Sequence, residues 1–279
     1  MAAARIGTSV IADQGGNTGT VAVTVTGGAT LAVLYVAGFF GTAADGFSGG
    51  TVSINGAAMT LARAQDSNDG LLKGCAFYLK NPTSGDLVFD WEGTSGASVG
   101  FPMLVVYYSG TDATTPIGDV GGQQIDPSPA TAGALTNTAN DLVVAAGFAS
   151  GPGGGTPAGI AYTGGLSEIQ ADFQQPGSPD AWLSYGEVAG SGSPITPGAS
   201  WTGGSDGGII GLVIKASAGA ATVALEWKQP TSQPTSHFNP SIVMQRSQSP
   251  QAVPFLPTLA PAPPIALEWV SSGVDIGWI

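Results

Sequence analysis

The chain contains one cysteine, one histidine and few charged residues, and each shortage excludes a class of function. With Cys75 alone, no intrachain disulfide can form, so we expect a buried structural thiol. The single histidine, His237, lies in a Pro/Ser-rich segment near the C-terminus, which excludes a multi-histidine metal site. It also leaves the rest of the chain without the base that a Ser or Cys triad uses. We therefore expect no catalytic residues, no metal and no cofactor, and a protein that is not an enzyme.

Basic residues are scarcer than acidic residues, with 7 Lys and Arg against 19 Asp and Glu, which gives a net charge of −12. Residues 1–219 carry a net −11 and the last 60 residues only −1. Such a surface repels phosphate backbones and anionic lipid, which excludes nucleic-acid binding and polybasic membrane attachment. No apolar run is long enough to insert into a membrane. The start "MAAARIGTSV" has no apolar h-region, so we expect no signal peptide and synthesis in a cytoplasm.

Glycine, proline and apolar residues are abundant, which favours short strands joined by tight turns. The chain has 44 Gly and 20 Pro, and 43% of its residues are hydrophobic. No long segment has the apolar spacing of an amphipathic helix, whereas "DLVFDWE" at 86–92 alternates as a half-buried strand does. In "VSINGAAMTL", Asn55-Gly56 is the residue pair preferred in type I′ hairpins. The sequence predicts an all-β fold, a two-sheet antiparallel β-sandwich.

Three landmarks recur at a nearly constant spacing and indicate an internal repeat. The tripeptide Ala-Gly-Phe begins at residues 37 and 146, expected hairpin glycines fall at 56 and 164, and Trp-x-Gly begins at 91 and 201. We interpret residues 1–219 as a sandwich with halves at about 18–110 and 128–217. One sandwich with pseudo-symmetric halves, or two small sandwiches in tandem, would fit. The short link at 111–124 favours the single sandwich.

Several segments together carry a family resemblance. The most specific are "YLKNPTSGDLVFDW", "YSGTDATTPIGD" and the following "NDLVVAAGF". In this order they resemble a glycine-rich jelly-roll β-sandwich that occurs in phage virion proteins (head decoration, spike or tail) and in bacterial surface proteins. The resemblance covers about residues 18–217. It implies the jelly-roll fold and a role, often adhesive, at a virion or cell surface, and it brings no catalytic motif.

Few other motifs suggest a binding site in this region. Trp182 in "DAWLSYG" and Trp201 in "ASWTGG" are the candidates for stacking on sugar rings, although most tryptophans of a sandwich pack in its core. Asp90 and Glu92 are expected on a solvated sheet face. "DSNDG" at 66–70 is one residue too short for the start of a calcium loop and lacks the distal Glu. "GPGGGTPAG" at 151–159 lacks the spacing of a phosphate-binding loop.

The final segment, residues 220–279, repeats one short apolar strand. "TVALEWKQP" at 222–230 and "PIALEWVSS" at 264–272 share Ala-Leu-Glu-Trp at an offset of 42 residues. From Lys228 to Leu267 the chain has nine prolines and no acidic residue. Because proline fixes φ and removes a backbone donor, we expect an extended, polyproline-like spacer that joins no sheet interior. "VDIGWI" at 274–279 adds another alternating segment.

Alternation places the apolar residues of each repeated strand on one face. Exposed strands of this kind need another polypeptide to cover them, so we expect docking by strand addition, with the spacer raising the effective concentration of the second strand. The alternative is that the first copy is a late strand of the sandwich and the second a coincidence. The predicted docking residues are Val223, Leu225, Trp227, Ile265, Leu267, Trp269, Ile276 and Trp278.

Together these features favour a structural protein at the surface of a phage or phage-like virion, anchored by an extended C-terminal arm. The expected partners are capsid, collar or tail subunits and further copies of the chain. A carbohydrate-binding adhesion module that recognises host surface glycan is the alternative. A polysaccharide-degrading enzyme is the third and weakest reading.

Overall fold

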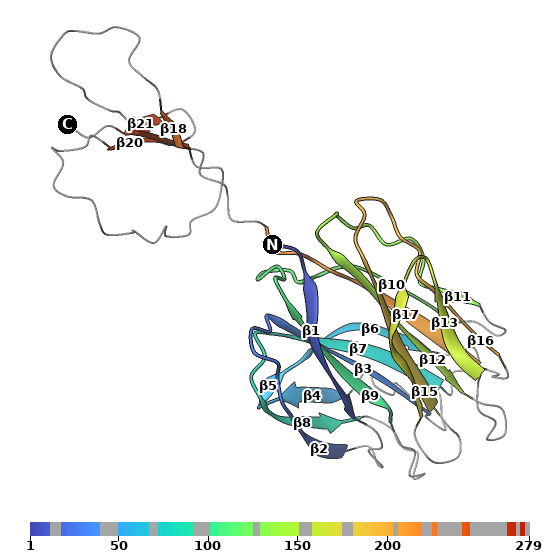
Figure 1. Cartoon of the computed structure of the whole chain (residues 1–279). Coiled ribbons are helices and arrows are strands. Elements are labelled where there is room, and N and C mark those ends of the chain that lie inside the picture. Colours follow the sequence, from blue (N-terminus) through green and yellow to red (C-terminus); the bar gives the residue numbers. More distant parts are fainter. Residues whose placement is uncertain are drawn as a thin grey trace, which may run out of the picture. The chain divides into compact units, whose positions relative to one another are not determined.

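The computed structural model describes residues 1–11, 18–39, 50–66, 72–91, 101–124, 129–150, 158–174, 181–202, 206–218, 225–227, 242–245, 267–271 and 274–276. Every helix or strand among these residues is a β-strand, so the predicted all-β fold is confirmed. The chain divides into two compact units, Met1–Ser217 and Ala218–Ile279. We call them the sandwich unit and the C-terminal unit (Figure 1).

The first half of the sandwich unit forms two sheets. Its strands are β1 (Ala4–Ile11), β2 (Thr18–Val23), β3 (Leu31–Phe39), β4 (Thr51–Ile54), β5 (Ala57–Ala58), β6 (Thr60–Asp66), β7 (Leu72–Lys80), β8 (Gly85–Asp90) and β9 (Met103–Ser109). The first large sheet has the order β1-β9-β3-β7-β6, and the first small sheet has the order β2-β8-β4-β5. All pairings in both sheets are antiparallel.

The second half repeats this arrangement. Its strands are β10 (Ile117–Gln124), β11 (Ala130–Thr131), β12 (Leu142–Ser150), β13 (Ala158–Thr163), β14 (Ser167–Gln174), β15 (Ala181–Ala189), β16 (Gly198–Thr202) and β17 (Asp206–Ile214). The second large sheet has the order β10-β17-β12-β15-β14, and the second small sheet has the order β11-β16-β13. Strand for strand, the large sheets have the same order, with β10 in the place of β1 and β14 in the place of β6.

Each half has a jelly-roll-like topology. In the first half the first strand in the sequence pairs with the last, β1 with β9. The strands that follow and precede them in the sequence pair in turn, β2 with β8 and β3 with β7. This is the pattern of a long hairpin rolled into two sheets. The fifth strand is split, so that β5 joins the small sheet and β6 the large one. The unit therefore consists of two halves of the same topology, which together form one compact unit.

The two large sheets pack against each other and are buried on both faces. On β3, the odd-numbered residues from Leu31 to Ala37 lie in the core between the large sheets. The even-numbered residues from Ala32 to Val36 lie in the core between the first large and first small sheets. On β12, even-numbered residues from Leu142 to Phe148 lie in the same inter-sheet core as the odd-numbered residues of β3. Burial on both faces explains why these strands are continuous apolar runs.

Glycines let the two halves approach closely around Phe148. The ring of Phe148 lies in the core between the large sheets, and the side chain is fully buried. A Cβ at Gly74 on β7 would lie 2.5 Å from the ring atom Cε1, and a Cβ at Gly208 on β17 would lie 2.5 Å from Cζ. Any larger residue at either position would displace the ring. One aromatic side chain of the second half is thus held by a glycine from each half.

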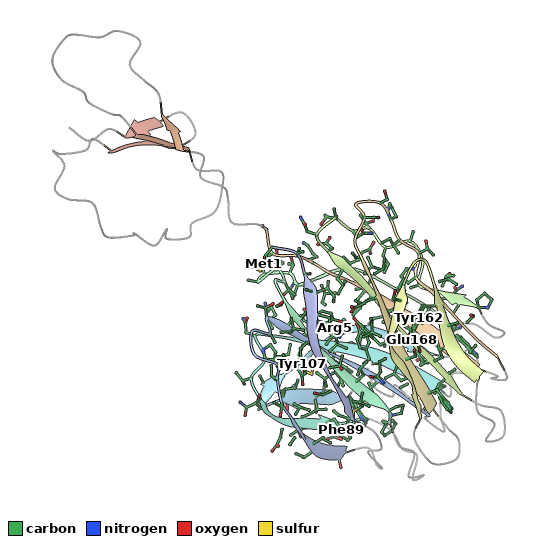
Figure 2. The ribbon with its side chains drawn as sticks, viewed as in Figure 1. Met1, Arg5, Phe89, Tyr107, Tyr162 and Glu168 are labelled. Carbon is green, nitrogen blue, oxygen red and sulfur yellow. The ribbon has the colours of Figure 1, made fainter. Side chains whose placement is uncertain are left out.

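A partly polar cluster also joins the halves. The Arg5 Nε atom on β1 donates a hydrogen bond of 3.0 Å to Glu187 Oε2 on β15, and the Tyr185 hydroxyl donates to the same oxygen at 3.0 Å. The hydroxyls of Tyr108 and Tyr185 lie 2.9 Å apart, and the ring centroids of Tyr35 and Tyr185 lie 5.5 Å apart. Burial raises the pKa of Tyr108 and of Tyr185 well above the usual range. Figure 2 marks Arg5 on β1.

Local features of the first half agree with their sequence signals. Asn55 and Gly56 both have positive φ, 50° and 75°, and connect β4 to β5, which confirms the predicted hairpin. Cys75 is 2% exposed, and its burial raises the pKa of the thiol, so the expected buried cysteine is also confirmed. The segment expected to be a link, residues 111–124, contains the edge strand β10. A glycine of this strand allows close approach of a neighbouring segment, since a Cβ at Gly121 would collide with the carbonyl oxygen of Ala132.

Candidate functional site

The described part of the C-terminal unit is a four-stranded sheet. Its strands are β18 (Leu225–Trp227), β19 (Ile242–Gln245), β20 (Leu267–Ser271) and β21 (Val274–Ile276), in this order across the sheet. The β18 strand is antiparallel to β19, β19 is parallel to β20, and β20 is antiparallel to β21. Both copies of the repeated sequence therefore belong to one sheet, on opposite sides of β19.

One strand of this sheet, β19, lies within residues 228–264, the segment expected to be an extended spacer. The physical reason is local, because Ile242–Gln245 contains no proline and the flanking prolines are Pro240 and Pro250. A proline-free apolar run of this kind, "SIVMQ", can supply ladder donors. It was the available signal that the sequence interpretation missed.

Register places the apolar residues of all four strands on one face. Directly paired residues share a face, and residues two apart on a strand share it as well. Leu225 pairs with Met244, Met244 with Trp269, and Trp269 with Ile276. Following the pairings gives one face, which we call the docking face, made of Leu225, Trp227, Ile242, Met244, Leu267, Trp269, Ser271, Val274 and Ile276. Ser271 is its only polar residue.

The alternate register positions include the acidic residues of the sheet. By the same register they hold Glu226, Val243, Gln245, Glu268, Val270 and Asp275. Glu226 and Glu268 both pair with Val243, and Asp275 pairs with Val270. No Lys or Arg occurs among the described residues of this unit. Register thus separates the positions of the acidic residues from those of Trp227 and Trp269.

Most of the predicted docking residues come together on the docking face. Leu225, Trp227, Leu267, Trp269 and Ile276 all lie on it by register. Alternation within each copy indicated which residues would share a face, but not that both copies would share one sheet. The remaining predicted residues, Val223, Ile265 and Trp278, lie outside the described residues.

The two candidate sugar-binding tryptophans are placed differently. Trp201 on β16 is 5% exposed and lies in a core cluster with Ile160 and Ala199. Its ring faces the interior, so the idea that it stacks on a sugar is wrong. Trp182 on β15 is partly exposed. The position equivalent to Trp201 in the first half is Trp91, which is 2% exposed, so the Trp-x-Gly landmark marks a core residue in each half.

The outer faces of the two small sheets are polar. On the first small sheet the exposed residues are Thr18, Thr20, Ala22, Thr51, Ala57, Ala58, Asp86, Val88 and Asp90. On the second they are Thr131, Ala161 and Thr163, beside the partly exposed Ser200. Asp90 is exposed as expected. Among the described residues of the sandwich unit, no sheet presents an apolar face to solvent. Figure 2 shows Phe89 and Tyr107 in the first half and Tyr162 and Glu168 in the second.

Metal-binding clusters and membrane-spanning helices are absent from the described residues. No group of three or more His, Cys, Asp or Glu in them is arranged to hold a metal ion. They include no helix long and apolar enough to span a membrane. His237, Glu92, most of "DSNDG" and most of "GPGGGTPAG" lie outside the described residues.

Comparisons with protein families, with curated proteins and with solved structures find no match for this chain.

Proposed function

We propose that this protein is a structural component of the surface of a phage or phage-like virion, a decoration, spike or fibre subunit that attaches through its C-terminal unit. The sandwich unit would be displayed, and the docking face would bind other virion proteins such as capsid, collar or tail subunits. The observation that carries the proposal is that both repeated strands belong to one sheet, on opposite sides of β19, in a unit separate from the sandwich.

Three further features support an attachment role rather than chemistry. The sandwich unit buries its large apolar strands between its own sheets, which leaves a polar exterior that suits display. The net charge of −12 disfavours direct contact with nucleic acid. The sequence resemblance to jelly-roll modules of virion proteins supplies the class of particle. Synthesis in the host cytoplasm and location at the virion surface follow from that class.

Deletion tests the attachment role. The full chain and a chain ending at Ser217 are each produced with an affinity tag during particle assembly, and the particles are purified on a density gradient. The full chain should co-purify with particles, and the shortened chain should remain soluble, folded and unattached. A full chain with Val270→Ser, a change at one of the alternate register positions, serves as the matched control and should co-purify normally. Attachment of the shortened chain would contradict the proposal.

Carbohydrate binding is the alternative role, and the partial exposure of Trp182 is the observation that favours it. A glycan array probed with the full chain and with Trp182→Ala tests this role. Binding that the substitution abolishes would support an adhesion module. Trp201→Ala is not a suitable probe, because it removes a buried ring and would weaken the fold.

A further inference from the structure

The hairpin between β4 and β5 contains the one asparagine of the chain that precedes a glycine, Asn55. Asn55 and Gly56 are both exposed, and an added Cβ at Gly56 would meet no atom within 4 Å. A glycine has no side chain to shield its backbone nitrogen or to restrict its rotation. The Asn55 amide therefore lies beside a backbone nitrogen that is open to solvent.

The neighbouring turn holds the Asn55 amide from two sides. Its Nδ2 atom donates a hydrogen bond of 3.0 Å to the Thr83 hydroxyl. A Cβ at Gly85 would lie 2.7 Å from Asn55 Oδ1, so the amide packs directly against the Gly85 backbone. The backbone N–H of Asn55 also donates to the carbonyl oxygen of Asp86 at 2.8 Å. Residues 83–86 thus hold both the main chain and the side chain of Asn55.

We propose that Asn55 is a modification site, which loses its amide by deamidation when the hairpin opens and which Thr83 protects while the hairpin is closed. In the reaction the Gly56 backbone nitrogen gives its proton to hydroxide and attacks Cγ of Asn55. The bond from Cγ to Nδ2 breaks, and Nδ2 takes a proton from water and leaves as ammonia. Water then opens the resulting cyclic imide at either carbonyl, which gives aspartate or isoaspartate. The solvent supplies every co-reactant.

The closed hairpin opposes this reaction through its side-chain and its backbone contacts. Attack requires the Cγ carbon of Asn55 to turn toward the Gly56 nitrogen, and that rotation draws Nδ2 away from Thr83 and disturbs the packing against Gly85. The positive φ angles of Asn55 and Gly56, 50° and 75°, belong to the paired hairpin and fix the backbone on both sides of the reacting nitrogen. Loss of one hydrogen bond corresponds to a factor of about five in rate.

Either product fits the hairpin less well than asparagine does. An aspartate places a second carboxylate on the residue whose N–H bonds to Asp86, and like charges on paired strands repel each other. An isoaspartate carries the main chain through Cβ and lengthens the two-residue loop of the hairpin. Deamidation would therefore loosen β5 at the edge of the first small sheet and add negative charge there.

The other described asparagines provide internal comparisons. Asn81 precedes Pro82, which has no N–H, so the following nitrogen cannot attack. Asn137 is buried, and its amide is hydrogen-bonded. Asn140 is exposed but precedes Asp141, which has a side chain beside that nitrogen. These three residues should keep their amides under conditions in which the hairpin site reacts.

Peptide mapping of the full chain during incubation at mildly alkaline pH tests the proposal. Folded and urea-unfolded samples are digested at intervals, and the conversion of Asn55 to aspartate and isoaspartate is quantified. Conversion should be at least about tenfold slower in the folded chain, because local opening precedes the reaction. Equal rates in the two states would overturn the proposal, as would an unfolded chain in which Asn55 keeps its amide. This comparison needs no variant.

Two substitutions separate the Thr83 hydroxyl from the bulk of its side chain. Thr83→Val removes the acceptor at nearly constant volume and should speed the conversion of Asn55 in the folded chain about fivefold. Thr83→Ser keeps the hydroxyl and should leave the rate within about twofold of the original. Thr83 is exposed, so both variants should fold. An unchanged rate in Thr83→Val, or equal acceleration in Thr83→Ser, would refute protection by Thr83.

Discussion

The sandwich unit and the C-terminal unit use their sequence repeats in different ways. In the sandwich unit each large sheet is covered on one side by a small sheet and on the other by its repeat partner. In the described part of the C-terminal unit the two copies of the repeated strand belong to one sheet, on opposite sides of β19. The difference teaches that a duplicated pattern can lead to two outcomes. Duplicating a whole set of strands provides a second sheet that covers the first, whereas duplicating a single strand adds strands to the same sheet.

The largest expected effect comes from opening the contact between the large sheets. Phe148→Ala should lower the free energy of unfolding of the sandwich unit by about 3–5 kcal/mol, because it leaves a cavity between Gly74 and Gly208. Denaturant unfolding followed by fluorescence measures the loss. Val88→Ala, at a site 42% exposed, is the control and should change stability by less than about 0.5 kcal/mol. Equal effects of the two substitutions would mean that the sheets do not share a core.

Alkaline pH should loosen the same contact. Burial raises the pKa of Tyr108 and Tyr185, which stay neutral in the folded state while the same groups ionise near pH 10 in the unfolded chain. Their contribution to the free energy of unfolding is therefore complete below about pH 10 and is lost as the pH rises beyond that value. Unfolding midpoints measured from neutral to strongly alkaline pH should fall above that value. In the double variant Tyr108→Phe/Tyr185→Phe the fall should be shallower, and an identical profile would contradict the assignment.

A smaller effect is expected at the ion pair between the halves. Arg5→Gln removes the donor to Glu187, whose side chain is 17% exposed, and should cost about 1–2 kcal/mol of unfolding free energy. Thermal and denaturant unfolding both report this change. Lys215→Gln, which removes an exposed contact to Thr115, provides the comparison and should have little effect. If the two variants lose the same unfolding free energy, the Arg5 contact does not help to join the halves.

The smallest effect sharpens the comparison between the units. A chain that ends at Ser217 retains all four sheets of the sandwich unit and should unfold with the same free energy as the full chain, within about 0.5 kcal/mol. Its sedimentation should show a monomer at every concentration. A clear loss of stability on truncation would mean that the C-terminal unit supports the sandwich, and the division into separate roles would fail.

Much of the fold was readable from local patterns. The alternation of "DLVFDWE" predicted a half-buried strand, which β8 is, and Asn55-Gly56 predicted a hairpin that the structure contains. The edge strands β1 and β10 were not predicted, because most residues of β1 are only partly buried and β10 lies in the segment interpreted as a link. Gly121 of β10 allows the close approach of Ala132, which is a property of the packing.

The candidate site was readable only in part, for a similar reason. Alternation identified Leu225 and Trp227 as neighbours on one face, and Leu267 and Trp269 as the same pair repeated. That the two pairs share a sheet depends on β19, which lies among prolines and separates them. Pairing between segments far apart in sequence leaves no local signature, because it depends on loop closure and on register rather than on neighbouring residues.

The sequence by itself determined that this chain forms strands, where several of them turn, which residues alternate and which patterns recur. Only the tertiary structure decided that the recurrence makes two similarly folded halves with one shared core, and that the repeated strand pairs on both sides of β19. The physical reason is that alternation along a strand specifies which residues share a face, but not which other sheet packs against that face. A face is covered by whichever sheet can reach it with matching shape, and that choice is made by contacts across the whole chain.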